Sequence, residues 1–323
     1  MSKYGPSSAF LLVGGRDISG DTFTLEETIE NVLEEKHGLG TAWEESLPVG
    51  LARVTLDAGG GLYDDRVGGI VEALQAKGAT RQLVLYGLSG KSPGAEATLL
   101  DGTYATTWKR ISSRDGLTKA HAVHKLTGEY LSGRLLLAAL ASADPGTGIS
   151  IDSAADPLSR PRVITSSSLA NPTTITCPVD HGMVNGEIIL ITGHSGSTPS
   201  LNGGNGYAIT STGLKTFTIP VNVTGAGTGG TYQKVSSLGL TADQHISSLV
   251  LGGFTNLIVK VQHSIDSTTW VDLFTFTAAT GITVERKSTL AQVNRWLKTT
   301  YDFSGTGSGQ SAGINLAVAR PVW

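Results

Sequence analysis

The sequence has a single cysteine, few charged residues and few aromatic ones. One cysteine, Cys177, excludes a disulfide framework and a multi-cysteine metal site, and a lone thiol of this kind is expected to be buried. No apolar run approaches the ~18 residues that a membrane-spanning helix needs, so we expect no membrane insertion by this chain. The first residues, Met1–Pro6, lack the apolar stretch of a secretory signal, which favours synthesis in a reducing compartment.

Charge is scarce and nearly balanced. The chain has 24 Lys and Arg against 27 Asp and Glu, a net charge of −3, and charged residues make up 16% of it, where about 25% is usual. This balance excludes a general attraction to nucleic acid. Glycine is abundant, at 42 of 323 residues. A weakly charged chain rich in glycine, serine and threonine favours an all-β structural or binding protein over an enzyme.

Short apolar or alternating runs between turn residues predict a mainly β fold, a tail-tube-like sandwich or barrel with one short packed helix. The helix is expected at about 65–77, because Asp64 and Asp65 can cap it and Val67, Ile70 and Leu74 share one face. The predicted strands are Ala9–Val13, Thr22–Leu25, Leu51–Leu56, Gln82–Tyr86, Thr103–Ile111, Leu131–Leu137, Leu257–Val261, Ile282–Val284 and Ile314–Val318.

Composition shifts predict three β-rich units. Residues 1–141 form the first, and 142–160 read as a linker. Residues 161–235 read as a small β-barrel insertion that decorates the exterior. Residues 236–323 form a C-terminal β domain that completes or duplicates the first fold.

Motifs that resemble known chemical sites lack the necessary context. Gly225–Gly230 has the letters of a dinucleotide fingerprint, but no helix pattern follows it. Gly87–Ser92 resembles a phosphate loop but lacks its first glycine. His121 and His124 are three apart in a predicted strand, so they point to opposite faces. We therefore expect no catalytic residue, no cofactor site and no metal site.

Two charge clusters are candidate contact sites. The acidic cluster is either a solvated loop or helix face, or an arm that docks on a basic neighbour or faces a like-charged polymer. It comprises Glu26, Glu27, Glu30, Glu34, Glu35, Glu44 and Glu45. The basic cluster, which could receive it in another copy of the chain, comprises Lys109, Arg110, Arg114 and Lys119.

Several segments follow the order found in one viral family. They include Gly14–Gly20 after the first strand, Thr41–Leu51 in the place of a long hairpin loop, Ile258–Ser264 and Val293–Leu297 in the C-terminal unit, and Asn171-Pro172 and Asp180–Gly182 in the insertion. With these features the chain resembles the major tail tube proteins of long-tailed, siphophage-like bacteriophages. The middle unit departs from the family, because many tube proteins lack it.

The resemblance implies a structural virion protein, assembled in the host bacterial cytoplasm, that forms helically stacked rings. It implies a conduit for genomic DNA, which passes as a duplex without specific binding. Hexameric rings are favoured, and pseudo-sixfold trimers are the alternative. The implied partners are further copies of the chain, the tape measure, the tail terminator and the tail tip.

The alternative function is a carbohydrate- or receptor-binding tail module. Trp270, Trp296 and Tyr207 are the aromatic candidates for such a surface, although we expect them in the core.

Overall fold

The structure is a computed structural model that describes residues 9–20, 22, 24–36, 45–62, 81–112, 116, 118–152, 161–203 and 206–320. These residues form 24 strands and no helix, which confirms the mainly β prediction. The predicted helix at 65–77 lies outside the described residues. Within the described ranges, no helical segment has the length and hydropathy that a membrane crossing requires.

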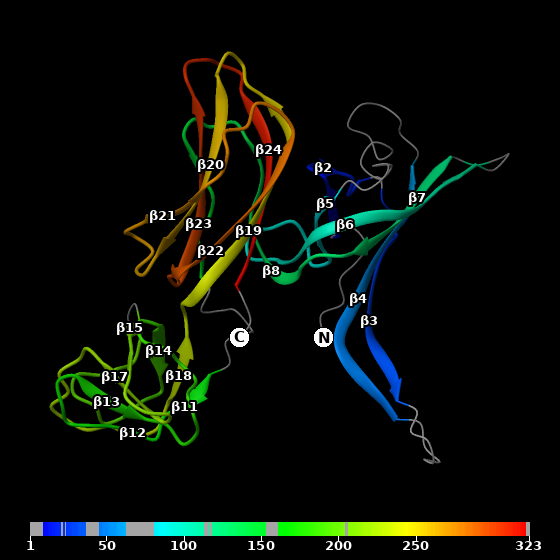
Figure 1. Cartoon of the computed structure of the whole chain (residues 1–323). Coiled ribbons are helices and arrows are strands. Elements are labelled where there is room, and N and C mark those ends of the chain that lie inside the picture. The colour runs from blue at the N-terminus through cyan, green and yellow to red at the C-terminus, as the bar shows by residue number, and fades with distance from the viewer. Residues whose placement is uncertain are drawn as a thin grey trace.

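The largest sheet has eleven strands and joins the N-terminal and C-terminal parts of the chain (Figure 1). Its main path is β2-β1-β5-β6-β8-β24-β19-β22, and β7, β4 and β3 branch from β6. The strands are β1 (Phe10–Val13), β2 (Arg16–Asp17), β3 (Thr24–Lys36), β4 (Glu45–Leu62), β5 (Gln82–Gly87), β6 (Glu96–Ile111), β7 (Lys119–Leu126), β8 (Tyr130–Ala141), β19 (Ser237–Val250), β22 (Thr283–Val293) and β24 (Ser311–Ala319).

The long strand β6 is the branch point of this sheet. Its first half pairs with β8 through Glu96–Leu100 and with β5 through Thr98–Thr103. Its second half, Thr103–Ile111, pairs with β7. One continuous strand therefore belongs to two layers, and this links a four-stranded ribbon, β3-β4-β7-β6, to the rest of the sheet.

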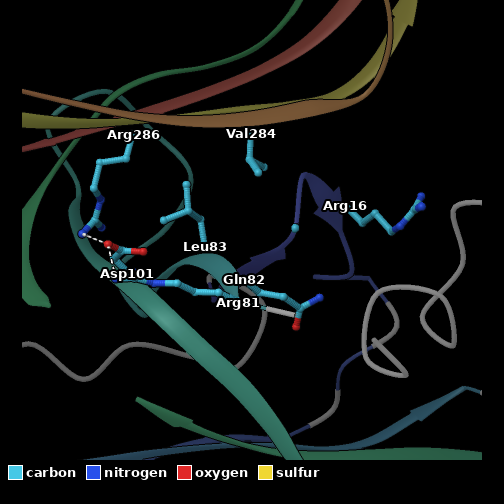
Figure 2. Close-up of a pocket in the computed structure, with 8 residues that line it drawn as sticks. Arg16, Arg81, Gln82, Leu83, Asp101, Val284 and Arg286 are labelled. Carbon is cyan, nitrogen blue, oxygen red and sulfur yellow. Dashed lines mark hydrogen bonds and ion pairs between the residues drawn. The ribbon is translucent and has the colours of Figure 1, made fainter. Parts of the chain in front are cut away.

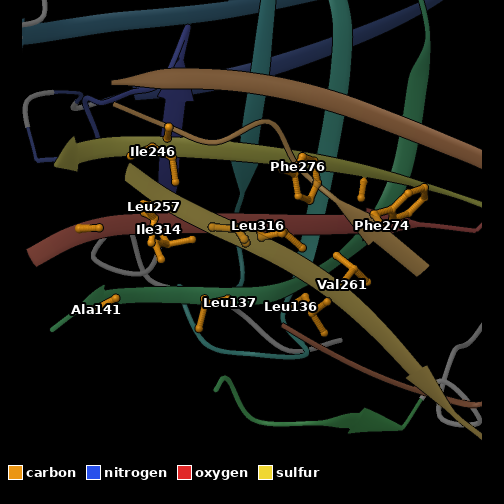
Figure 3. Packing of buried hydrophobic residues seen from close by; sticks show 14 of the residues in the cluster. Leu136, Leu137, Ala141, Ile246, Leu257, Val261, Phe274, Phe276, Ile314 and Leu316 are labelled. Atoms are coloured by element: carbon orange, nitrogen blue, oxygen red, sulfur yellow. The ribbon is translucent and has the colours of Figure 1, made fainter. Parts of the chain in front are cut away.

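A second sheet packs against β8, β24 and β19 to make a sandwich (Figure 3). Alternation explains the packing: Leu257, Val259 and Val261 point inward, and the residues between them point out. Leu136 of β8 and Leu316 of β24 meet them in the same core. This sheet contains β9 (Gly146–Thr147), β10 (Ile151–Asp152), β20 (Asn256–Ser264), β21 (Val271–Thr275) and β23 (Trp296–Ser304).

Strand β1 is buried on both faces. Leu11 and Val13 pack beneath the ribbon with Leu56 of β4 and Ala122 of β7. Phe10 and Leu12 pack on the opposite face with residues of β6, β8 and β24. Because every residue of this strand is buried, its sequence reads as a continuous apolar run rather than an alternating one.

The middle of the chain forms two four-stranded sheets that pair only among themselves in the described residues. A core that includes Ile175, Ile189 and Phe217 lies between them. Strands β11 and β18 pair with each other, so the chain enters and leaves this unit at adjacent points. The strands are β11 (Arg162–Val163), β12 (Ser166–Ser167), β13 (Thr173–Thr176), β14 (Ile188–Thr192), β15 (Tyr207–Ala208), β16 (Thr210–Ser211), β17 (Thr216–Ile219) and β18 (Thr231–Lys234).

Two expectations about local structure need correction. The segment from Glu26 to Lys36, expected in a loop or helix face, is part of the regular strand β3, because its register with β4 continues almost to the hairpin end. Residues 146–152, expected in a linker, include β9 and β10, which pair with β23 and so belong to the sandwich.

Candidate interaction surfaces

The hairpin of β3 and β4 extends beyond the body of the protein. β4 pairs with β7 only from Thr55 to Leu62, whereas its pairing with β3 continues back to Glu45. At about 3.3 Å per residue, the two strands run on alone for roughly 30 Å. Figure 1 shows this hairpin extending away from the sandwich, toward the bottom of the view. Among the described residues, this part of the hairpin pairs with no further strand.

The ribbon β3-β4-β7-β6 has one apolar face and one polar face. Leu56, Ala120 and Ala122 are buried on the apolar face, against β1 and β5. The polar face is not covered by any described element. Its exposed charged residues are Glu26 and Glu30 on β3, Arg53 on β4, Lys119 and Lys125 on β7, and Lys109 on β6. Between the acidic and basic sides, His121 Nε2 lies 2.5 Å from Asp57 Oδ1.

Both long edges of this ribbon lack a partner strand within the described ranges. β3 pairs with β4 alone. Residues 104–111 of β6 pair with β7 on one side, and β5 ends its pairing at Thr103 on the other. Open edges of this length are normally blocked or used for assembly.

The structure distributes the predicted contact residues over the ribbon. Glu26 and Glu30 are exposed on its polar face. Glu34 and Glu35 of β3 and Glu45 of β4 belong to the extended part of the hairpin. Lys109 and Arg110 are exposed at the end of β6. Glu44 and Arg114 lie outside the described residues.

The acidic and basic clusters do not meet within one chain. Lys36 pairs with Glu45 at one end of β4, and Lys119 pairs with Leu62 at the other, beside the β6 terminus. Glu34, Glu35 and Glu45 therefore lie at the opposite end of the ribbon from Lys109, whereas Glu26 lies across the ribbon nearly level with Lys109.

Glu27 differs from the other acids because it points to the apolar face. Its carboxylate is partly buried near Tyr86 of β5 and Tyr130 of β8. Burial raises the pKa of Tyr86, and the nearby Glu27 carboxylate adds to that rise. Glu27 thus belongs to the root of the hairpin, and its side chain points to the opposite face from Glu26 and Glu30.

A cleft of about 530 Å³ lies between β22 and the strands β2, β5 and β6 (Figure 2). At one end of it, Arg286 Nε and Nη2 donate to the two carboxylate oxygens of Asp243, each at 2.6 Å. Arg286 Nη1 donates to Glu129 Oε2 at 3.2 Å. Arg81 Nη2 donates to Asp101 Oδ2 at 2.7 Å, and that oxygen is 3.9 Å from Arg286 Nη1.

This network joins residues that are far apart in the sequence. Asp101 and Glu129 come from the N-terminal part of the chain, and Asp243 and Arg286 from the C-terminal part. Asp243 is completely buried; burial raises the pKa of its carboxyl, and the hydrogen bonds from Arg286 oppose that effect. The network holds the two parts of the large sheet in register, and no sequence motif marks it.

His245 of β19 and His124 of β7 are buried, and no sequence motif marks either of them. Burial lowers the pKa of His245 to about 3, with a further contribution from Arg286, and lowers that of His124 to about 4. His124 is buried and His121 is partly exposed, which confirms that they point to opposite faces of β7. His121 and His124 therefore cannot bind one metal ion together.

The described residues contain no group of three His, Cys, Asp or Glu side chains placed to hold a metal ion. Cys177 is buried, as expected. A serine and a histidine do meet in the middle unit, where Ser167 Oγ lies 3.0 Å from His194 Nε2. Both are buried, and backbone groups of Gly227 and Gly229 complete their hydrogen bonds. The hydrogen bonds of this pair therefore link neighbouring loops, and its burial prevents a substrate from reaching it.

The aromatic residues correct one expectation. Trp270 and Trp296 were expected in the core, but both are partly exposed and neither belongs to a core cluster. Tyr207 does pack against the core of the middle unit.

Comparison with known proteins gives no close relative. No protein-family model matches the chain, and no curated protein matches its sequence. Among solved structures, a chain from the virion of a native gene transfer agent particle is 12% identical, with a TM-score of 0.29, over 40% of this chain and 97% of its own. The SPP1 Dit protein, described as a hub adsorption apparatus in phages that infect Gram-positive bacteria, is 8% identical, with a TM-score of 0.27, over 97% of this chain and 99% of its own. Both TM-scores lie below 0.5, so neither superposition establishes a common fold.

Proposed function

We propose that the protein is a structural component of a phage tail that assembles with copies of itself into rings, and that stacked rings form a tube for genomic DNA. The observation that carries the proposal is the ribbon β3-β4-β7-β6, with two open edges and an uncovered polar face. Neighbours from a virion and from a tail adsorption apparatus agree with this setting.

The ribbon can continue from one copy into the next. Its four strands alternate in direction, so β3 of one copy can pair antiparallel with β6 of another in the same orientation. A contact between two different edges is heterologous and closes into a ring when the rotation permits. Closure removes both edges, which protects them from unwanted pairing.

Charge supports this pairing. The β3 edge exposes Glu26 and Glu30, and the β6 edge exposes Lys109 on the same polar face. When the edges pair, acidic side chains come to lie beside a basic one. Opposite charges on adjacent strands contribute little energy, about 0.2–1 kcal/mol for a pair, but they select register and orientation.

The hairpin extension supplies a contact along the tube axis. Its acidic tip and the basic end of β6 lie at opposite ends of the ribbon, so stacking in one orientation brings the tip of one ring to the basic end of the next. In such a tube the polar face of the ribbon faces the channel, because the apolar face is already covered. Hexamers remain the favoured ring.

Charge reversal tests the lateral contact. The double variant Glu26→Lys with Glu30→Lys is expected to give folded subunits that no longer form rings in negative-stain microscopy and analytical ultracentrifugation. Adding Lys109→Glu should restore assembly, because the charges are then exchanged across the joint. Asp180→Lys, on the exposed surface of the middle unit, is the matched control. Normal rings from the double variant would contradict the proposal. A wild-type chain that forms no rings would contradict it as well.

A further inference from the structure

The second sheet lies on the side of the sandwich away from the ribbon (Figure 1), and two tryptophans, Trp270 and Trp296, lie at its outer face. Leu297 and Thr299 of β23 are buried in the sandwich, so Trp296 and Lys298 point outward. Lys298 pairs with Gln262 of β20, and Gln262 pairs with Asp272 of β21. The outer face therefore carries three polar side chains on adjacent strands, Lys298, Gln262 and Asp272, next to Trp296.

The Lys298 side chain lies against Trp270, and Trp296 is nearby on the same strand as Lys298. Its Nζ lies 4.2 Å from the centre of the Trp270 ring. Trp296 lies two residues earlier on the same face of the same strand. An ammonium group over an indole ring is held by the negative face of the ring, which fixes the side chain without consuming its hydrogen-bond donors.

Two other cations near Lys298 are paired with carboxylates, whereas Asp302, farther along the same strand, is exposed. Lys260 Nζ donates to Asp272 Oδ2 at 2.7 Å, and Arg295 Nη2 donates to Asp152 Oδ2 at 2.7 Å. No carboxylate among the described residues forms an ion pair with Lys298. Lys298, a cation without a carboxylate partner in the described part of the chain, thus lies over Trp270, and Arg295 lies over the neighbouring Trp296 with its Cζ 5.1 Å from the ring centre.

We infer that this face binds an acidic carbohydrate. A pyranose ring has an apolar C–H face that can stack on an indole, and its carboxylate can accept hydrogen bonds from the Lys298 ammonium. Gln262 and Asp272, fixed to each other by a 2.6 Å hydrogen bond, stand beside the site and can bond to ring hydroxyls. The charge complementarity at Lys298 favours an acidic sugar over a neutral one. The site is separate from the ribbon, so it does not depend on ring assembly.

Calorimetric titration of the full chain with trigalacturonic acid tests the inference. We expect a dissociation constant of about 1 mM or tighter, typical of a shallow site with one charged contact. Lys298→Gln should weaken binding roughly tenfold or more, since hydrogen bonds to a charged group are lost. Trp296→Ala should weaken it as well.

The controls separate the contributions of charge and ring. Lys260→Gln removes a cation of the same face that is already paired, and binding should stay within about twofold. Maltotriose, a neutral trisaccharide, and an oligoglutamate of equal charge should both bind more weakly than trigalacturonic acid. Absence of binding to trigalacturonic acid, equal binding of either control ligand, or wild-type affinity in Lys298→Gln would each overturn the inference. Circular dichroism checks that each variant is folded.

Discussion

A buried ion pair in the C-terminal part of the chain also reaches the N-terminal part, because Arg286 Nη1 donates to Glu129. Asp243 is fully buried, and Arg286 is its bidentate partner. Arg286→Ala leaves the carboxylate buried without a cation, so we expect a loss of about 3–5 kcal/mol in the free energy of unfolding, measured in urea. Lys260→Ala, which breaks an exposed pair, should cost less than about 1 kcal/mol. Equal losses in the two variants would show that burial does not determine the effect.

Protonation of His245 gives the protein an acid sensitivity. Its pKa is lowered from 6.5 to about 3 by burial, so between these values the unfolded chain binds a proton that the folded chain does not. Stability is therefore complete above pH 6.5 and falls as the pH decreases toward 3, by up to about 1.4 kcal/mol per pH unit.

His245→Gln removes this titration. We expect its urea midpoint to change less between pH 7 and pH 5 than that of the wild type, whatever the substitution costs at pH 7. The same change in both proteins would assign the acid sensitivity to other groups, His124 among them.

At the scale of elements, the β3–β4 hairpin has two separable parts. The root, which includes Leu25, packs against the body and pairs with β7 through β4, whereas beyond Asn31 and Ala52 the two strands pair only with each other in the described residues. Replacing residues 32–51 by Asn-Gly closes the hairpin with a two-residue turn that suits antiparallel strands.

This shortened hairpin should fold and form single rings, because the lateral edges remain, but the rings should not stack. Electron microscopy distinguishes rings from tubes directly. Tubes of normal length from the shortened chain would rule out a stacking role for the extension, while leaving the lateral contact in place.

At the scale of the whole molecule, the middle unit is joined to the rest through neighbouring strands. Arg162 pairs with Tyr232 and Val163 with Thr231, so a short linker can replace residues 162–235. The closure costs little, because loop entropy changes slowly with length. The one side-chain hydrogen bond from β22 to this unit in the described residues, from Gln292 to the carbonyl of Gly186, would be lost.

We expect the chain without residues 162–235 to fold and to assemble as the full chain does, because neither ribbon edge involves this unit. Ultracentrifugation and microscopy of the two chains side by side provide the measurement. A folded monomer that no longer assembles would place the unit in the wall of the assembly.

Much of the architecture follows from the sequence because it depends on local periodicity. Alternation in Leu257–Val261 determines which side chains of β20 reach the core, and apolar runs predict strands where β20 and β24 lie, although β24 is buried on both faces. The same alternation places His121 and His124 on opposite faces of β7. The composition of the sequence indicates the acidic cluster, but it does not indicate that this segment pairs regularly with β4. Charged residues have a low strand propensity, so they give little sign of a strand.

Only the tertiary structure decided what depends on contacts between distant segments. The sequence determined a β-rich, weakly charged chain with an acidic and a basic cluster. It could not determine that both clusters lie on one ribbon, that Asp243 pairs with Arg286, or that Lys298 lies over Trp270. Strand order and register are set by the packing of whole sheets, and a shift of one residue would move each of these side chains to the other face.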